Sequence, residues 1–332
     1  MKILFHANTL NYRGTTVAVT DYARYNQEIL GNESVIIYDE SIRYEKDMGT
    51  ELKVLYDLKR KFNVVGYGKN QLQKVIDKQK ADVAYFIRAG NKEPLPTNIK
   101  TCVHSVFQFN EPHGDRYAYI SKWLSNKMSN GKLPYVPHIV DIRGRLKPEV
   151  CKTLLSAALK TPYSNIENKS FNKIIVGRIG GWNTFDIPFV RDVVLELADT
   201  DKFYFWFTGT APFSIPHRNI IFADNTNVPG MKTLFMETCD VMLHGRQRGE
   251  SFGLSIAEFL SFNRPVLAWN DGLDQNHMEM LKGSGLLYNN ANELKELLYN
   301  VKDYKDKEDW TKRVEQYKPL PVMTKFKEVF LS

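Results

Sequence analysis

Two glutamates, Glu250 and Glu258, stand eight positions apart in the stretch GRQRGESFGLSIAEFLSFNRPVLAW, residues 245–269. The first comes just before a glycine-bearing turn, and the second falls about two turns inside the helix expected to follow it. Eight helical positions span on the order of 12 Å. That length is similar to the separation of the two ends of a ligand joined by a diphosphate, so each carboxylate can hold the hydroxyl groups at one end.

The turn between the two acids has the properties of a diphosphate-binding site. Residues 240–244, DVMLH, are expected to form a strand, and ligands in open α/β sheets bind at the carboxyl ends of strands. We expect the next helix to begin near Phe252 with Ser251 as its N-cap. Its unpaired N–H groups and its dipole favour an anion, and Gly253 has no side chain to prevent close approach.

Size and charge limit the possible classes of protein. A chain of 332 residues exceeds what one hydrophobic core usually supports, so two domains are expected. The net charge of +7 suits an anionic partner, which leaves a nucleoside diphosphate, a nucleic acid or an acidic membrane open. The sequence has no arginine-rich tract, zinc-finger spacing or clear helix-turn-helix. Nucleic acid is therefore not an expected partner.

The three cysteines, Cys102, Cys151 and Cys239, are widely spaced and odd in number. They predict neither a disulfide framework nor a zinc site and fit a reducing cytosol. The N-terminal residues MKILFHANTL predict a first β-strand, because a signal peptide needs a longer apolar run. No apolar run is long enough to span a bilayer. We therefore expect a cytoplasmic protein.

Short apolar runs alternate with longer amphipathic stretches along the whole chain, which predicts βαβ units and parallel sheets. In the first half, strands are expected at 2–7, 34–38, 62–67, 82–87, 100–105 and 118–121, and helices near 15–30, 49–60, 69–80 and 122–130. In the second half, strands are expected at 173–177, 203–209, 219–223, 240–244, 265–269 and 285–288, and helices at 187–199, 230–238, 253–262, 291–301, 307–316 and 322–331.

These two series predict two doubly wound, Rossmann-like α/β domains that face each other. The polar segment 161–170 suits a linker. The expected divisions are an N-terminal domain over 1–165, a C-terminal ligand-binding domain over 166–318, and a terminal helix over 319–332 that could cross back to the first domain.

The run ESFGLSIAE followed by FLSFNRPVLA resembles the E-x7-E signature of the family-four retaining glycosyltransferases, which have the GT-B fold. Two departures are visible: Ser251 replaces the usual glycine, and the pair at 263–264 replaces the usual small residues. The resemblance implies that Glu250 contacts the donor hexose and that Glu258 holds the ribose hydroxyls. It also implies that 251–254, namely Ser251, Phe252, Gly253 and Leu254, line the diphosphate.

The stretch KIIVGRIGGWN, residues 173–183, is similar to the family's G-R-L loop, whose arginine binds the donor phosphates. Arg178 matches that arginine. A guanidinium suits the role because it can donate two hydrogen bonds at once to phosphate oxygens. The family usually adds a lysine a few residues later, but this chain has Trp182, Asn183 and Thr184 there. Arg246 or Arg248 could supply the missing charge.

Three further segments resemble donor-binding loops of the family by position. The first loop keeps one glycine, Gly14, with Thr15 beside it, and an ordinary strand-to-helix turn is an equal alternative. Gly209 corresponds to a glycine loop near the nucleotide base. Backbone groups of Asn227 and Val228 would read the edge of that base.

His104 ends the expected strand at 100–105, where a family histidine reaches the donor sugar. The alternative for a lone histidine is a structural role. The loop at 107–117 follows, and His113, Asp115 and Arg116 are its candidate acceptor-binding residues; a polar surface loop is the alternative.

The sequence shows no expected metal ligands. Asp199 and Asp201 form a D-x-D at a helix-to-strand turn, where aspartates are common turn formers. The basic stretch at 53–62 could touch an anionic membrane on its inner face, although a solvated helix face is the more ordinary interpretation. No cofactor is expected beyond the donor substrate.

The resemblance implies a retaining hexosyltransferase that moves a sugar from a nucleoside-diphosphate donor to an acceptor hydroxyl, with a glycan as the expected acceptor. A UDP or a GDP donor would fit equally. Two alternatives stay open: a non-catalytic protein that binds a nucleotide sugar or a glycan, and a GT-B nucleotide-sugar epimerase.

Overall fold

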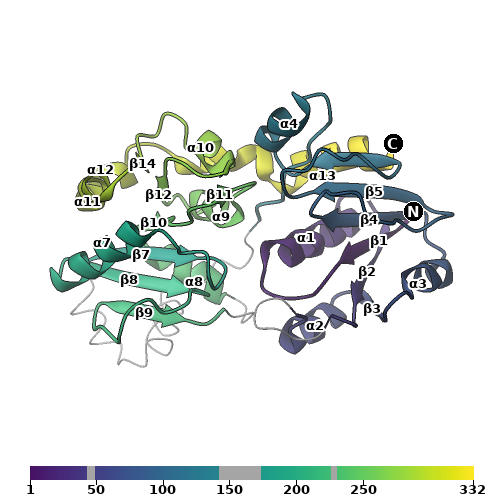
Figure 1. The fold of residues 1–332 in the computed structure, drawn as a ribbon, viewed down its shortest axis with the longest axis horizontal. Coiled ribbons are helices and arrows are strands. Elements are labelled where there is room, and N and C mark those ends of the chain that lie inside the picture. The colour runs from purple at the N-terminus through teal and green to yellow at the C-terminus, as the bar shows by residue number, and fades with distance from the viewer. Residues whose placement is uncertain (43–48, 142–172, 226–229) are drawn as a thin grey trace. The chain divides into compact units, whose positions relative to one another are not determined.

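The computed structural model describes residues 1–42, 49–141, 173–225 and 230–332 (Figure 1). Its contacts divide the chain into two compact units, Met1–Ile139 with Gln316–Ser332 and Val140–Glu315. The domain boundary predicted near 165 and the linker at 161–170 lie outside the described residues, so both stay predictions.

The first unit contains one parallel sheet of six strands in the order β3-β2-β1-β4-β5-β6. Its strands are β1 (Lys2–Ala7), β2 (Glu33–Asp39), β3 (Asn63–Tyr67), β4 (Val83–Arg88), β5 (Lys100–Ser105) and β6 (Arg116–Tyr119). Its helices are α1 (Gly14–Glu28), α2 (Leu52–Lys59), α3 (Leu72–Gln79), α4 (Lys122–Ser129), α13 (Pro319–Phe326) and the π-helical turn η2 (Lys327–Leu331).

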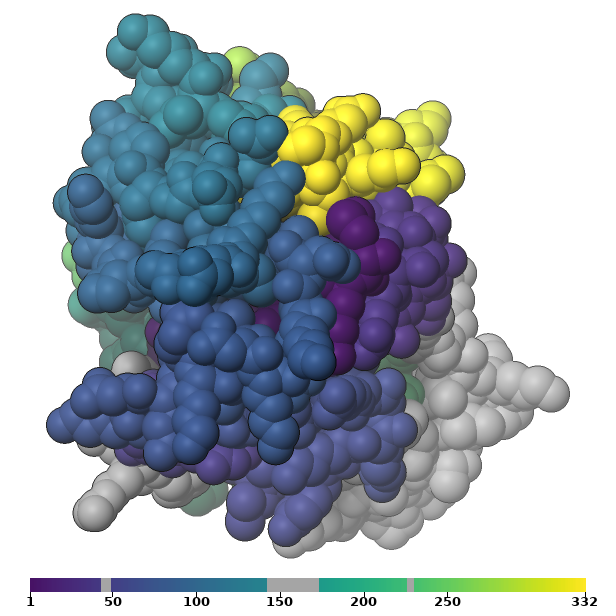
Figure 2. Space-filling model, turned by 90° about the vertical axis from the view of Figure 1, so that its right-hand side faces the viewer, coloured from purple at the N-terminus to yellow at the C-terminus, as the bar shows by residue number. Residues whose placement is uncertain are grey.

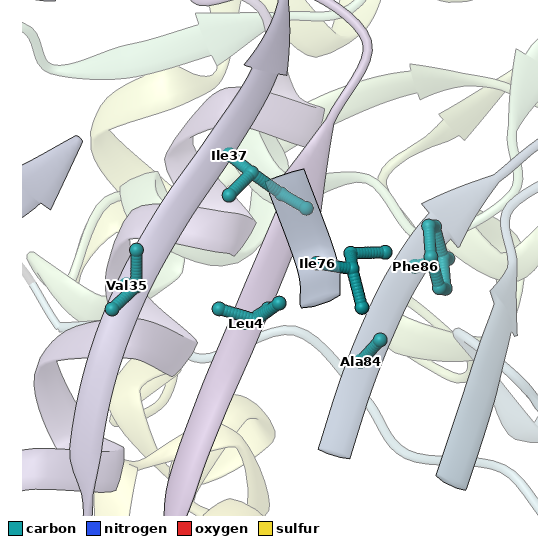
Figure 3. Packing of buried hydrophobic residues seen from close by; sticks show 6 residues of the cluster. All are labelled: Leu4, Val35, Ile37, Ile76, Ala84 and Phe86. Atoms are coloured by element: carbon teal, nitrogen blue, oxygen red, sulfur yellow. The ribbon is translucent and has the colours of Figure 1, made fainter. Parts of the chain in front are cut away.

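Alternate side chains of these strands pack on opposite faces of the sheet, as the pleat requires. Figure 3 shows one face, where Ile76 of α3 covers a cluster of strand residues made of Leu4, Val35, Ile37, Ala84 and Phe86. On the other face, Phe5 and Tyr85 contact Phe326 of α13, with ring centroids 6.3 and 5.2 Å apart. Helices therefore cover both faces, which makes the sheet doubly wound.

The C-terminal segment belongs to this first unit. Figure 2 shows it, in yellow, beside the purple N-terminal part of the chain. Phe326 stacks on Tyr22 of α1 at 5.1 Å, and the backbone oxygen of Ser332 accepts hydrogen bonds from Lys100 and Arg116. The last helix thus completes the core of the N-terminal sheet.

The second unit contains another parallel sheet of six strands, in the order β14-β12-β10-β7-β8-β9, and a two-stranded ladder. The large sheet has strands β7 (Ile174–Ile179), β8 (Phe203–Thr208), β9 (Ile220–Ala223), β10 (Val241–Leu243), β12 (Val266–Trp269) and β14 (Leu287–Tyr288). The ladder joins β11 (Gly249–Glu250) to β13 (Asp274–Gln275). The helices are α7 (Pro188–Asp199), α8 (Met231–Thr238), α9 (Leu254–Ser261), α10 (Asn276–Met280), α11 (Ala291–Tyr299), α12 (Val301–Lys305) and the 3-10 helix η1 (Trp310–Tyr317).

Helices also cover both faces of this sheet. Trp206 of β8 packs edge-on against Phe235 of α8, which in turn contacts Phe259 of α9. Phe203, on the opposite side of β8, contacts Tyr299 of α11 at 5.4 Å. The second unit is therefore doubly wound as well, and the prediction of two Rossmann-like α/β domains is confirmed.

Numbered within its own unit, each sheet has the strand order 3-2-1-4-5-6. The chain switches sides between the first and fourth strands, which are β1 and β4 in the first unit and β7 and β10 in the second. A crevice opens at the carboxyl ends of such a strand pair, and ligands bind there.

The sequence-based elements agree with the structure to within a few residues, with three corrections. The last strand of the first sheet runs over Arg116–Tyr119 and not 118–121. The helix predicted at 307–316 is the 3-10 helix Trp310–Tyr317. The ladder β11–β13 and the short helices α10 and α12 were not predicted, because elements of two and five residues are too short to show a hydrophobic period.

Candidate functional site

The carboxyl ends of β7 and β10 bring two predicted elements of the site together. These strands pair in parallel, with Val241 opposite Val176 and Met242 opposite Gly177. Arg178 is the last residue but one of β7, and His244 directly follows β10. Both residues therefore lie at the switch point of the second sheet, where the topology favours a ligand.

Arg178 is held in place by neutral groups. Its guanidinium donates to the hydroxyls of Thr210 and Thr184, the second at 2.7 Å, and lies 5.2 Å from the centre of the Phe185 ring. A Cβ on Gly180 would come within 2.6 Å of the guanidinium, so glycine leaves the space that Arg178 occupies. Arg178 is only 4% exposed, and among the described residues no carboxylate forms an ion pair with it.

Burial lowers the pKa of Arg178 to about 10, against an opposing attraction from Glu250. The group stays charged at neutral pH, so the folded protein carries a desolvated cation. A shift of that size corresponds to a free energy on the order of 3 kcal/mol. An anionic ligand would offset this energy, which makes Arg178 a candidate phosphate-binding residue.

The two-residue ladder β11–β13 positions Glu250. Gly249 pairs with Asp274, and Glu250 pairs with Gln275. The backbone N–H of Glu250 also lies 3.3 Å from Nδ1 of His277, whose Nε2 lies 2.9 Å from the backbone oxygen of Trp269. The loop after β10 is thereby tied to the loop after β12.

Gly249 is required at the ladder for two reasons. Its φ is +74°, and a Cβ there would lie 2.0 Å from the backbone oxygen of Asp274 and 2.8 Å from the ring of His277. We expect Gly249→Ala to lower the free energy of unfolding by at least about 3 kcal/mol, because the backbone oxygen cannot move aside cheaply. Chemical denaturation of the purified variant measures this loss.

The matched control is Gly283→Ala. Gly283 has nearly the same φ, +73°, but a Cβ there meets nothing within 4 Å. It should cost only the left-handed backbone strain, about 1–2 kcal/mol. Equal losses in the two variants would show that close packing at Gly249 is not important.

Basic groups surround the carboxylate of Glu250. Oε2 lies 3.0 Å from the guanidinium of Arg246, and Oε1 lies 3.4 Å from Nε2 of His244. Burial alone would raise the pKa of Glu250, but the contact with His244, the charge of Arg246 and the charges that His244 and His277 carry when protonated outweigh it and lower the pKa to about 2. Glu250 is thus ionised at neutral pH and can accept hydrogen bonds from hydroxyl groups.

This low pKa predicts a pH-dependent contribution to stability. The folded-state pKa lies below the ordinary glutamate value of 4.5, so the stabilisation is complete above pH 5 and is lost as the pH falls toward 2. From pH 7 to pH 3, we expect the difference in unfolding free energy between the wild type and Glu250→Gln to narrow by about 2 kcal/mol. Urea titrations at both pH values measure it, and curves that stay parallel would contradict the prediction.

Glu258 lies inside α9 and is buried, with 7% of its side chain exposed. Its carboxylate accepts a hydrogen bond from Nζ of Lys232 on α8. In this structure the residue is paired within its own unit. Sequence reasoning identified Glu258 but missed Lys232, because the two residues are far apart in the chain.

The start of α9 differs from the prediction. The helix begins at Leu254, and Gly253 precedes it with φ of +90° and ψ of 52°; no side chain caps the helix. Ser251 is therefore not the N-cap. The turn is held instead by Asn276, whose side-chain amide donates to the backbone oxygen of Phe252 at 2.6 Å.

That turn still offers backbone groups to a ligand. Phe252 is buried, so its ring packs in the core and only its backbone can face an anion. The first N–H groups of α9, from Leu254 onward, have no helical acceptors because the first helical bond runs from Ala257 to the oxygen of Gly253. Helix starts of this kind bind phosphates.

Arg248 contributes to the loop itself. Its Nε donates to Asp274 at 2.7 Å, and its backbone oxygen accepts from the N–H of Asp274 at 2.9 Å. Asp274 is 2% exposed, so this ion pair is part of the loop architecture. Arg246 likewise contacts Glu250. Compensation for the lysine that the family has after Arg178 therefore stays a prediction for both arginines.

The predicted base-binding loops are described only in part. Gly209 directly follows β8 and has φ of +65°, and a Cβ there would lie 2.4 Å from the side chain of Asn225. The hydroxyl of the next residue, Thr210, is one of the two that accept hydrogen bonds from Arg178. Asn227 and Val228 lie outside the described residues, so their predicted contact with a base stays a prediction.

In the first unit, Gly14 and Thr15 form the exposed start of α1, after the carboxyl end of β1. This is the edge where a ligand loop was expected. Thr16 is buried instead and closes the turn, because its hydroxyl accepts from the N–H of Asn11 and donates to the oxygen of Thr9. Of the three residues 14–16, Gly14 and Thr15 are thus accessible for a ligand contact and Thr16 is not.

His104 is completely buried among aromatic rings. Its Nδ1 lies 2.6 Å from the hydroxyl of Tyr85, and its Nε2 lies 2.8 Å from the backbone oxygen of Val136. Burial lowers its pKa to about 4, so the ring is neutral. Both ring nitrogens are used inside the fold, and this geometry favours the structural role over a contact with the donor sugar.

Two of the predicted acceptor residues lie at the other edge of the first sheet. Asp115 accepts from the N–H and hydroxyl of Thr101, near the start of β5, and Arg116 begins β6. This is the amino edge of parallel strands, whereas ligands bind at the carboxyl edge. His113 is in the loop before them, 2.7 Å from the oxygen of Glu111. This placement gives the acceptor role no support.

The carboxyl edge of the first sheet holds polar residues that sequence reasoning missed. Nε2 of His6 lies 2.6 Å from the hydroxyl of Tyr67, and Arg88 lies 3.1 Å from Glu93. His6 and Arg88 are both buried, and each has one ring or guanidinium nitrogen without a partner among the residues that the structure describes. Their position in β1 and β4, beside the switch point, is the signal that could have identified them.

Within the residues that the structure describes, no group of three or more histidine, cysteine or acidic side chains is arranged to hold a metal ion. Among the helices that the structure describes, none is both long enough and apolar enough to cross a bilayer.

Comparison of the sequence with protein-family models and with curated proteins gives no match. The fold does match solved structures. A glycosyltransferase from Rickettsia africae ESF-5 has a TM-score of 0.64 and 16% identity, covering 98% of this chain and 94% of its own. HepE of Anabaena, solved with UDP and glucose, has a TM-score of 0.70 and 14% identity, covering 99% and 98%.

WaaG, described as a glycosyltransferase involved in lipopolysaccharide biosynthesis, has a TM-score of 0.65 and 9% identity, covering 99% of each chain. At such low identities these likenesses concern the fold. They confirm the predicted fold class, GT-B.

Proposed function

We propose that this chain is a glycosyltransferase that moves a hexose from a nucleoside-diphosphate donor to an acceptor hydroxyl, with retention of configuration. The observation that supports this most is the group at the switch point of the second sheet. Arg178, a buried cation with neutral partners, lies near the end of β7. Glu250, an ionised acid, contacts His244, which directly follows the neighbouring strand β10, and the start of α9 follows Glu250. These groups suit a diphosphate and a sugar.

The proposed roles follow from charge. Arg178 and the first N–H groups of α9 would bind the diphosphate and stabilise the negative charge that develops as it leaves. Preorganised groups of this kind usually make the largest contribution to catalysis. Glu250 would accept hydrogen bonds from the hexose hydroxyls. Glu258 would hold the ribose hydroxyls, which requires it to share or release its contact with Lys232.

In the proposed reaction the acceptor hydroxyl attacks the anomeric carbon from the face that the diphosphate leaves. The bond from the anomeric carbon to the diphosphate oxygen breaks, a bond to the acceptor oxygen forms, and the acceptor proton passes to the departing phosphate. No carboxylate forms a covalent bond. A glycan is the proposed acceptor, bound by the first unit.

The experiment is a thermal-shift screen that begins with UDP and UDP-glucose, because HepE was solved with these ligands, and continues with GDP and GDP-sugars. A ligand at 100 times its Kd stabilises the protein by about 2.7 kcal/mol, which raises the Tm by several degrees. Slow hydrolysis of the stabilising sugar nucleotide should follow. If no nucleoside diphosphate raises the Tm at millimolar concentration, the proposal fails.

A non-catalytic protein that binds a nucleotide sugar is the second candidate. One observation favours it: Arg246 contacts Glu250 and Arg248 contacts Asp274, so neither plainly replaces the phosphate-binding lysine of the family. Turnover distinguishes the two functions. A binding protein would show the same thermal shift but no release of sugar from the donor.

We also propose that α2 touches an anionic membrane surface. Leu52 and Tyr56 lie one turn apart and are more than 60% exposed, and Lys53, Lys59 and Arg60 are close in sequence. Sedimentation with vesicles of anionic phosphatidylglycerol should be lost in a Leu52→Ser, Tyr56→Ser variant. Binding that is equal with neutral phosphatidylcholine vesicles, or that the variant retains, would contradict this contact.

A further inference from the structure

His244 is fixed beside Glu250 by the sheet itself. Its N–H donates to the oxygen of Leu267 at 2.9 Å, and its backbone oxygen accepts a hydrogen bond from the hydroxyl of Tyr288. The residue is 3% exposed, and its ring lies 5.0 Å from that of His277. The backbone and the packing therefore leave the ring little freedom.

Neither ring nitrogen of His244 has a hydrogen-bond partner within the described residues. A buried polar group without a partner normally destabilises a fold, and an apolar side chain of similar size would avoid this. The nearest charged group is Oε1 of Glu250, at 3.4 Å from Nε2. This distance is too long for a full hydrogen bond but short enough to become one after a small movement.

The neighbouring groups indicate where the proton of His244 resides. His277 donates from Nε2 to the oxygen of Trp269, so its Nδ1 is the acceptor for the N–H of Glu250. Burial, followed by the influence of His244, lowers the pKa of His277 to about 4, and this ring is neutral. Because Glu250 is ionised, a lone pair on Nε2 of His244 would face a lone pair on Oε1. The proton therefore belongs on Nε2.

The other charged groups near Glu250 differ from His244 in rigidity or reach. Arg246 contacts Oε2, but its side chain is 27% exposed and has a long flexible stem. Arg178 acts on Glu250 through its charge, without a contact. His244 is thus the rigid donor that faces the carboxylate.

We propose that His244 is a positioning residue for Glu250: its Nε2–H fixes the orientation of the carboxylate, and the contact shortens when a ligand engages Glu250. The inference rests on the proposed role of Glu250 in holding the donor sugar. Contacts at catalytic groups are often long in ligand-free structures and tighten in the complex.

The first test needs no ligand. In wild-type protein labelled with ¹⁵N-histidine, Nε2 of His244 should carry a proton, and the His244→Gln spectrum assigns the signal. A proton on Nδ1 alone would overturn the inference.

The second test follows the carboxyl carbon of Glu250 in ¹³C-glutamate-labelled protein, with Glu250→Gln used for assignment. In His244→Leu the signal should titrate at a clearly higher pH than in the wild type, and His244→Gln, which keeps an N–H donor, should lie between them. His217→Leu, which removes a histidine of the same unit away from Glu250, should leave the titration unchanged. Coincident titrations of the wild type and His244→Leu would overturn the inference.

The third test measures hydrolysis of UDP-glucose. We expect kcat to fall about tenfold in His244→Leu and less than about threefold in His244→Gln, with KM within about twofold in both. A His244→Leu enzyme with normal kcat contradicts the positioning role. If the wild type neither binds nor hydrolyses nucleotide sugars, the proposed function fails, and the two spectroscopic tests still decide whether His244 orients Glu250.

Discussion

Glu250→Gln should abolish most of the turnover while leaving the donor able to bind. The variant keeps the size of the side chain and one carbonyl acceptor, but it loses the charge that faces the developing positive charge on the sugar. Removing one such preorganised group typically lowers kcat about 10²–10³-fold. We expect a loss in this range for release of glucose from UDP-glucose, with KM changed much less. Single-turnover measurements separate the two effects.

The control for this variant is Glu279→Gln. Glu279 is an exposed acid on α10. The substitution Glu279→Gln therefore makes the same chemical change outside the site. Its turnover should equal that of the wild type. The thermal shift with UDP checks that Glu250→Gln is folded and still binds. Turnover within a factor of about three of the wild type would remove Glu250 from the proposed mechanism.

The fold was predictable because its signals are local. A buried parallel strand reads as a short apolar run, and the segments at 2–7 and 100–105 match β1 and β5. The alternation of strands with amphipathic stretches predicts the doubly wound class. The strand order 3-2-1-4-5-6 was not predicted, since it depends on which face of the sheet each crossover takes.

The candidate site was predictable in part for the same reason. Arg178 lies near the end of β7, and Glu250 lies in the loop segment that follows β10, so the sequence places both near a carboxyl edge. The partners of Glu250 are different. His277 follows it by 27 positions and meets it only because β11 pairs with β13. A two-residue ladder leaves no periodic pattern, so no local signal marks this contact.

The predicted start of the helix after Glu250 was also wrong, because a glycine there has a left-handed backbone conformation. Ser251 is a good N-cap residue by type, but Gly253 takes a left-handed conformation and the helix begins one residue later. Glycine adopts this conformation with little strain, and serine does not. The pairing of Glu258 with Lys232 depends on the packing of α8 beside α9, which the sequence alone does not reveal.

Replacing Arg178 by methionine should leave the stability of the fold unchanged or raised but should weaken the binding of UDP. Its guanidinium is buried against two threonine hydroxyls and an aromatic ring, with no acid paired to it among the described residues. Replacing a buried charge by an apolar side chain of similar volume is often neutral or stabilising by about 1–4 kcal/mol. We therefore expect Arg178→Met to unfold at the same or a higher urea concentration than the wild type.

The same variant should bind UDP about 100-fold more weakly, because charged hydrogen bonds to the phosphates are lost and each is worth about 1.5–3 kcal/mol. Arg178→Lys should recover only part of the affinity, since an ammonium cannot fork onto two phosphate oxygens while keeping both threonine contacts. Titration calorimetry measures all three affinities.

Arg264→Met is the control for Arg178→Met, and we expect the opposite result for it. The guanidinium of Arg264 donates to the backbone oxygens of Met236 and Glu237 at the end of α8, so its loss should lower stability without changing the affinity for UDP. If Arg178→Met behaved like Arg264→Met, the burial of Arg178 would have a structural purpose. Weaker UDP binding together with unchanged or greater stability is the result that a phosphate-binding arginine requires.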